Sequence, residues 1–276
     1  MSRIIWLASY PKSGNTWMRA FLANYVLNTP DPVPLGDLRA FSLSDVRPRF
    51  YDQVFDGDIR RMTAGESVSL RAAAQRRLAA AKDHDHFVKT HSRQGMLQGM
   101  PLIDRSVSAG AIYIVRNPLD VVPSYASHLG VDIDRAIGVM ADPDHATLEA
   151  DVQIKTAIGR WDTHVASWLD DAQSLPVCLV RYEDMRAAPE KTFGQVIRTL
   201  GLPSDPDRLA RAVRHSSFEE LSRQESESGF SERPPHMERF FRAGRSGAGA
   251  QELASGQRDR LVAEFGAVMR KLGYLS

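Results

Sequence analysis

Four short stretches of the chain are rich in apolar residues and have the length expected of β-strands. They cover residues 3–9, 86–90, 111–116 and 177–182. Three are nearly continuous apolar runs, whereas a histidine and a lysine interrupt residues 86–90. Continuous apolar runs are typical of parallel strands covered on both faces, because an exposed face would produce an alternation of apolar and polar residues.

Between these stretches, apolar residues recur every three or four positions, which predicts helices. The four predicted helices cover residues 17–26, 149–171, 189–200 and 261–272. The second of them rests on a stripe of apolar side chains, Ile154, Ile158, Trp161, Val165 and Trp168. Pro189 opens the third, while Gly201 and Gly273 end the third and the fourth. Strands that alternate with helices predict a three-layer α/β/α fold with a central, mostly parallel sheet.

The whole chain, residues 1–276, is expected to form a single domain, because neither a linker nor an internal repeat divides it. Three stretches, near residues 30–80, 130–148 and 222–250, look irregular or variable. Ligands of such sheets bind beyond the carboxyl ends of the strands. We therefore expect the three stretches to build the rim of the binding pocket.

Composition indicates a globular protein with ample core, since 43% of the residues are hydrophobic and 25% are charged. The net charge of +1 gives no global field that would favour nucleic acid or an anionic membrane as partner. The single cysteine, Cys178, lies in an apolar run and is expected to be a buried thiol. No apolar run reaches the roughly eighteen residues of a membrane span, and the N-terminal run is too short for a signal peptide. These features lead us to expect a soluble, cytoplasmic protein.

The stretch YPKSGNTW joins the first predicted strand to the first predicted helix. Peptide N–H groups at such a turn point outward, and the helix dipole adds partial positive charge, so the turn can bind an anion. Gly14 permits close approach of a phosphate, and Lys12 adds a full charge. Further side-chain donors come from Ser13, Asn15 and Thr16. A simple turn capped by serine, with a solvated lysine, is the alternative.

A Walker A loop is a poor match to this stretch. That loop requires a lysine after its second glycine, whereas Lys12 precedes the only glycine. No acidic residue at a neighbouring strand end offers an evident Mg²⁺ ligand. An ordinary ATPase is therefore disfavoured.

A second candidate anion site follows the third predicted strand, in the stretch VRNPLDVVPSYASHLG. Arg116 ends the strand, Pro118 is expected to begin a further helix, and Ser124 lies eight residues beyond Arg116. A strand-end arginine and a hydroxyl two helical turns away can converge on one phosphate. Alternatively, Arg116 forms a surface ion pair with Asp120.

Together these two stretches resemble the cytosolic-type sulfotransferase family, in its 5′-phosphosulfate loop and its 3′-phosphate site. Four further stretches resemble that family's motifs in the same order: FVKTH at 87–91, VRYEDM at 180–185, RHSSFEEL at 214–221 and FFRAGRSG at 240–247. The resemblance implies a P-loop-like sulfotransferase fold. The nucleotide-binding residues it implies are Lys12, Ser13, Gly14, Asn15, Thr16, Trp17, Arg116, Ser124, Tyr182, Ser216, Phe218, Arg242, Ala243 and Gly244.

The chain departs from the family pattern at a few of these positions. Asn15 stands where threonine is common, although an amide also donates hydrogen bonds. In the late loop, Ala243 replaces a basic residue, and alanine and glycine at 248 and 249 replace Asp-Trp. Arg245 is a candidate to compensate in binding the 3′-phosphate.

The resemblance implies 3′-phosphoadenylyl sulfate (PAPS) as donor, its bisphosphate PAP as product, and a hydroxyl or amine of a small molecule as acceptor. Negative charge grows on the leaving phosphate oxygen, and Lys12 is the cation expected there. His91 is the expected general base, and Lys89 is expected to steady the sulfonate oxygens. No metal is expected, because protein donors meet the charge on the leaving group. The HDH stretch at 84–86 lacks a clustered third ligand, which favours a solvated segment before the strand over a metal site.

Two other functions fit parts of the sequence. One is a P-loop-like kinase of small alcohols, and the other is a nucleotide-binding module without catalysis. A carboxylate in the 30–80 stretch is the alternative to His91 as base. Arginine outnumbers lysine about five to one, which suggests a bacterial source. The acceptor and the oligomeric state are left open by the sequence.

Overall fold

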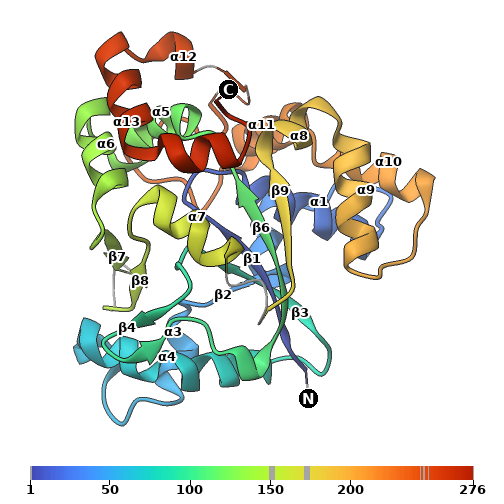
Figure 1. Cartoon of the computed structure of the whole chain (residues 1–276). Coiled ribbons are helices and arrows are strands. Elements are labelled where there is room, and N and C mark those ends of the chain that lie inside the picture. Colours follow the sequence, from blue (N-terminus) through green and yellow to red (C-terminus); the bar gives the residue numbers. More distant parts are fainter. Residues whose placement is uncertain are drawn as a thin grey trace.

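A five-stranded parallel sheet forms the centre of the computed structural model, which describes residues 2–148, 153–170, 175–242, 244, 246–247 and 249–275 (Figure 1). The strand order is β2-β3-β1-β6-β9, and every neighbouring pair runs parallel. The strands are β1 (Ile4–Ser9), β2 (Leu43–Ser44), β3 (His86–Thr90), β6 (Ser108–Val115) and β9 (Val177–Arg181). The four predicted strands are therefore confirmed, and the two-residue edge strand β2 is the one described strand of this sheet that was not predicted.

Side chains of the central strands point alternately into two separate cores. Trp6 and Tyr113 belong to one core, whereas Leu7 and Ile112 belong to the other, and all four are at most 1% exposed. The first core is closed by α4 (Ala64–Ala79), α5 (Pro118–Leu129), α6 (Ile133–Ala141), α7 (Trp161–Leu169) and α13 (Ser255–Lys271). The second is closed by α1 (Asn15–Leu27), α8 (Tyr182–Ala187), α9 (Pro189–Thr199) and α10 (Pro206–His215). Helices on both faces of a parallel sheet confirm the three-layer α/β/α fold.

Further elements complete the described part of the chain. The helical ones are η1 (Leu35–Asp37), α2 (Leu38–Phe41), α3 (Pro48–Asp52), η2 (Ile59–Arg61), η3 (Arg105–Val107), α11 (Phe218–Ser228) and α12 (Gly249–Glu252). Two antiparallel pairs are formed by β4 (Met96–Leu97) with β5 (Met100–Pro101), and by β7 (Ala146–Leu148) with β8 (Lys155–Ala157). No helix in the described ranges is long and apolar enough to cross a membrane.

The predicted helix over residues 149–171 is wrong in its first half. Residues 155–157 form β8, Gly159 is left-handed with φ of 70°, and α7 begins only at Trp161. Ile154 and Ile158 flank β8 and are both buried, so their spacing reflects tertiary packing rather than one helical face. Residues 149–152 and 171–174 lie outside the described part.

The stretch 30–80 is also more regular than predicted, because α4 occupies most of its last third. Three polar residues on the buried face of α4, Ser67, Arg71 and Gln75, obscure the apolar periodicity. A capping box between Thr63 and Glu66 is the sequence signal that could have found this helix. The other two stretches contain α6, β7 and most of α11.

Cys178 is half-buried rather than buried, because β9 is an edge strand of the sheet. Its thiol lies 3.8 Å from the hydroxyl of Thr199, and burial raises the pKa of the thiol. The neighbouring Leu179 is 38% exposed. The apolar run 177–182 is thus covered less completely than the other strands.

The chain changes direction across the sheet at β1. It passes from β1 to β3 on one side, and then returns to β6 on the other side. The carboxyl ends of β1, β3 and β6 therefore lie side by side at a topological switch point, which is where ligands of α/β sheets bind.

Candidate active site

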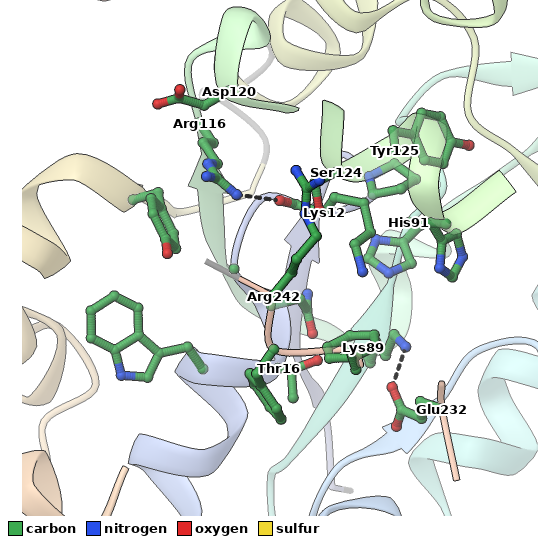
Figure 2. A pocket seen from close by; sticks show the side chains of 18 of the residues that line it. Lys12, Thr16, Lys89, His91, Arg116, Asp120, Ser124, Tyr125, Glu232 and Arg242 are labelled. Carbon is green, nitrogen blue, oxygen red and sulfur yellow. Dashed lines mark hydrogen bonds and ion pairs between the residues drawn. The ribbon is translucent and has the colours of Figure 1, made fainter. Parts of the chain in front are cut away.

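A single cavity of about 340 Å³ lies at this switch point and brings most of the predicted site residues together (Figure 2). The predicted residues that line it are Lys12, Gly14, Asn15, Thr16, Trp17, Lys89, His91, Arg116, Ser124, Tyr182, Phe218, Arg242 and Gly244. Ser13 and Ser216 are fully buried and do not line it. Ala243 and Arg245 lie outside the described residues.

Lys12 is a buried cation in a left-handed backbone conformation, with φ of 65°. Its Nζ has no hydrogen-bond partner among the described residues and lies 3.8 Å from the centre of the Phe240 ring. Burial, reinforced by the charges of Lys89 and Arg116, lowers its pKa to about 8. Burial of an unpaired ammonium group is costly, so this position favours an anionic ligand.

The N-terminus of α1 is open toward the cavity. Its N-cap is Gly14, which has φ of 104° and caps the helix with no side-chain hydrogen bond. A Cβ atom at Gly14 would lie 2.7 Å from Tyr182 Cδ2, so both conformation and contact require glycine. The Oγ of Ser13 is buried without a hydrogen-bond partner in the described ranges. The turn therefore presents donors that α1 itself does not use.

Asn15 acts differently from the way the sequence suggested. Its Nδ2 donates to the carbonyl of Leu7 at 2.8 Å and to the hydroxyl of Ser9 at 3.3 Å. The side-chain amide thus ties the turn to β1 and is not directed to a phosphate.

Arg116 and Ser124 line the cavity from the end of β6 and from α5 (Figure 2). The Nη1 of Arg116 donates to the carbonyl of Lys12 at 3.3 Å, and its guanidinium lies 4.2 Å from the centre of the Tyr182 ring. This contact connects the two predicted anion sites directly. The proposed alternative partner, Asp120, uses its carboxylate to accept hydrogen bonds from the backbone N–H groups of Gly247 and Gly249.

Aromatic side chains form the wall of the cavity beside Arg116. The rings of Trp17 and Tyr182 meet edge to face with centroids 5.7 Å apart. Phe218, at the start of α11, contacts the late loop at Gly244, where an added Cβ would lie 2.3 Å from the ring. These rings provide apolar surface suited to a planar heterocycle.

His91 follows β3 and has a fixed tautomer. Its Nδ1 lies 2.8 Å from the carbonyl oxygen of Ser9, which can only accept, so Nδ1 carries the proton and Nε2 keeps its lone pair. Burial lowers the pKa of His91 to about 3, with a further contribution from the charge of Lys89. The imidazole is therefore neutral near pH 7 and can accept a proton.

Lys89 is held by a carboxylate that the sequence did not reveal. Its Nζ donates to Glu232 at 2.9 Å, and Arg19 donates to both oxygens of the same carboxylate at 2.8 and 3.0 Å. Burial alone would raise the pKa of Glu232, but the charges of Lys89 and Arg19 outweigh it and hold the pKa well below its usual range. No local pattern signals Glu232, which lies 143 residues from Lys89.

His164 is a second residue that sequence reasoning missed. It is fully buried on α7, and its Nε2 donates to the carbonyl of His91 at 3.1 Å. Its Nδ1 therefore accepts from the hydroxyl of Tyr113 at 2.8 Å. This arrangement fixes the backbone of His91 against the first core.

A carboxylate from the 30–80 stretch also lines the cavity. The Oδ2 of Asp45 accepts from Arg71 at 2.8 Å and from Thr90 at 3.0 Å. Burial raises the pKa of Asp45, although the charge of Arg71 opposes this shift. The sequence left open a carboxylate of the 30–80 stretch as an alternative base. Asp45 is a carboxylate of that stretch that lines the cavity.

The HDH stretch shows no metal-site geometry. His84 contacts Asp83 at 2.7 Å, and the Nδ1 of His86 lies 3.2 Å from the carbonyl of His84. Across the described ranges, no three His, Cys, Asp or Glu side chains are grouped as metal ligands.

Comparisons with known proteins point to one family. The family model described as "Sulfotransferase domain" matches residues 2–273. The chain is 25% identical over 273 residues to sulfotransferase 1A1 of Canis lupus familiaris, covering 97% of this chain and 83% of that protein. It is 31% identical over 108 residues to sulfotransferase 1B1 of Mus musculus, covering 39% and 35% of the two chains.

Two solved structures share the fold. One is mouse sulfotransferase SULT7A1 complexed with PAP, at a TM-score of 0.61 and 21% identity, covering 97% of this chain and 84% of that chain. The other is retinol dehydratase in a complex with retinol and PAP, at a TM-score of 0.67 and 15% identity, covering 98% and 82%. At these identities the likeness establishes the P-loop-like fold alone.

Proposed function

The chain belongs to the sulfotransferase domain family, and from this premise we propose that it transfers a sulfuryl group from PAPS to a hydroxyl or amine of a small molecule. One observation carries the proposal. A buried lysine Nζ with no hydrogen-bond partner among the described residues, a helix N-terminus without a side-chain cap and a strand-end arginine face one cavity. Such a cavity suits a ligand with two separated anionic groups, as PAPS has.

The residues of the cavity suggest how the donor binds. The 5′-phosphosulfate would lie on the turn from Lys12 to Trp17, and the 3′-phosphate would lie beside Arg116 and Ser124, with Arg242 and Gly244 of the late loop nearby. The adenine would lie against the aromatic wall formed by Trp17, Tyr182 and Phe218. Cations and hydrogen-bond donors would then face the phosphosulfate and the 3′-phosphate, and aromatic rings would face the adenine.

In the proposed reaction, the acceptor oxygen or nitrogen forms a bond to sulfur while the bond from sulfur to the bridging phosphate oxygen breaks. The acceptor proton moves to Nε2 of His91, and the negative charge moves to the 5′-phosphate of PAP. Lys12 stabilises that charge as it develops. Lys89, oriented by Glu232, steadies the sulfonate oxygens.

The other two functions are less well supported. A kinase of the P-loop type needs lysine after the second glycine of the turn, and this chain lacks that order. A non-catalytic module would not require the tautomer that Ser9 imposes on His91.

A turnover assay tests the proposal. The purified protein is incubated with either PAPS or Mg-ATP and a panel of phenols, alcohols and amines. PAP and the sulfated or phosphorylated products are quantified by mass spectrometry, and PAP binding is measured by calorimetry. We expect PAP to accumulate with an equal amount of sulfated acceptor. Phosphorylated acceptor formed from Mg-ATP would support the kinase instead, and PAP binding without product from any acceptor would support the module.

A further inference from the structure

The carboxylate of Asp120 lies in the wall of the cavity, on the same side as Arg116. Asp120, in the first turn of α5, lines the cavity together with Arg116 and is only 5% exposed (Figure 2). Its Oδ2 accepts from the backbone N–H of Gly247 at 2.8 Å, and its Oδ1 accepts from the N–H of Gly249 at 2.8 Å. Each carboxylate oxygen is thus bonded to the late loop, more than 120 residues away in sequence.

The backbone of the loop lies directly on the start of α5. A Cβ atom at Gly249 would lie 1.8 Å from the carbonyl oxygen of Leu119, so no other residue fits there without moving the loop. At the opposite end, Gly244 has φ of 55° and packs against Phe218 at the start of α11. Of the described residues of this segment, Gly244 thus contacts α11, whereas Gly247 and Gly249 are bonded to Asp120 on α5.

We propose that Asp120 is a positioning residue for the nucleotide. It holds the late loop on α5 and so keeps the cavity in the shape that binds the bisphosphate. This inference rests on the proposed function, because it assumes that the cavity binds PAPS and PAP. Asp120 would raise nucleotide affinity without touching the nucleotide.

Two physical views of Asp120 predict opposite effects of removing its charge. If the carboxylate acts only as a charge, it repels the phosphates, and a neutral residue would strengthen PAP binding. If it positions the loop, a neutral residue would weaken PAP binding, because an amide offers one acceptor oxygen to two N–H donors. The sign of the change therefore decides between them.

The test is calorimetric titration of the full chain with PAP. We expect Asp120→Asn to weaken binding by about tenfold and Asp120→Ala by more, as for the loss of one and two charge-assisted hydrogen bonds. The KM for PAPS should rise while kcat at saturating PAPS stays near that of the wild type. Asp132→Asn is the matched control, since Asp132 caps α6 by the same kind of bond to Arg135 and does not line the cavity.

A backbone variant tests the same idea without changing charge. Gly249→Ala should weaken PAP binding as Asp120→Asn does, and the double variant should be little worse than either single one. Gly256→Ala, where an added Cβ meets no atom within 4 Å, should leave binding unchanged. Unchanged or tighter binding in Asp120→Asn, or additive effects in the double variant, would overturn the inference. If wild-type protein does not bind PAP, the proposed function itself fails, and that result is separate from these.

Discussion

At the scale of single residues, the account depends most on Lys12. Its ammonium group lies in a left-handed turn without a hydrogen-bond partner in the described part of the chain. Burial, with a further contribution from the charges of Lys89 and Arg116, lowers its pKa to about 8. Such a position is unfavourable in an isolated protein and becomes favourable when an anion binds. The same pKa makes anion binding depend on pH in a range that is easy to measure.

We expect kcat/KM for PAPS to be nearly constant from about pH 5 to pH 7 and to fall above about pH 8. The charged form of Lys12 binds the anion and is lost as pH rises through its pKa of about 8. His91 has a pKa of about 3, so it stays neutral throughout this range. In Lys12→Arg the alkaline fall should disappear, because arginine stays charged. An alkaline fall of the same midpoint in that variant would assign the titration to another group.

Arg116→Ala should weaken PAP binding by about 1.5–3 kcal/mol, the range for hydrogen bonds to charged groups. The measurement is the Kd for PAP compared with the Kd for adenosine 5′-phosphate, which lacks the 3′-phosphate and should change little. Arg181→Ala is the control, since Arg181 also ends a strand but lies on the ring of Tyr274 and not in the cavity. Equal losses for both nucleotides would place the 3′-phosphate elsewhere.

His91→Ala should lower turnover by about 10²–10⁴-fold, as expected when a general base is removed. The Kd for PAP should be unchanged, because the proposed nucleotide contacts lie on other residues. If turnover is undiminished, His91 is not the base, and Asp45→Asn would then be the variant to measure.

At the scale of elements, the sequence predicted best where one local pattern determines the structure. The strand β1, the turn after it and α1 follow from an apolar run, a glycine and a helical stripe that adjoin one another. The failures have a common cause in tertiary packing. The helix α4 was missed because polar residues such as Arg71 lie on its buried face. The helix over residues 149–171 was predicted too long because Ile154 is buried and fits a helical spacing, although it lies outside any described helix. Glu232 was missed for the same reason, since only the fold brings it to Lys89.

The helix α7 illustrates how a buried element supports the site. His164→Phe should lower kcat by about five- to tenfold with little change in the Kd for PAP, because it removes the hydrogen bond to the carbonyl of His91. His164→Gln keeps an N–H donor and should recover part of the loss. Trp168→Phe is the matched control, because it removes a similar bond to the carbonyl of the neighbouring Ser92.

The measurement for α7 is kcat at saturating substrates together with the unfolding temperature of each variant. A role limited to stability would lower the unfolding temperature of the His164 and Trp168 variants alike and leave kcat unchanged in both. That pattern would contradict a positioning role for His164.

At the scale of the whole molecule, the order of strands places the two predicted anion sites in one cavity. β1 lies between β3 and β6, so Lys12, His91 and Arg116 follow three adjacent strand ends. The sequence predicted this convergence because parallel strands share one carboxyl edge. It did not predict which residues of the other segments close the cavity, since those contacts depend on side chains that meet only after folding.

The central claim is that one cavity binds both phosphates of PAP, and thermal unfolding with different nucleotides tests it most directly. At a PAP concentration a hundred times its Kd, we expect Tm to rise by about 5 °C or more. Mg-ATP and adenosine 5′-phosphate at the same concentration should have little effect. An equal or larger rise with Mg-ATP would contradict the account.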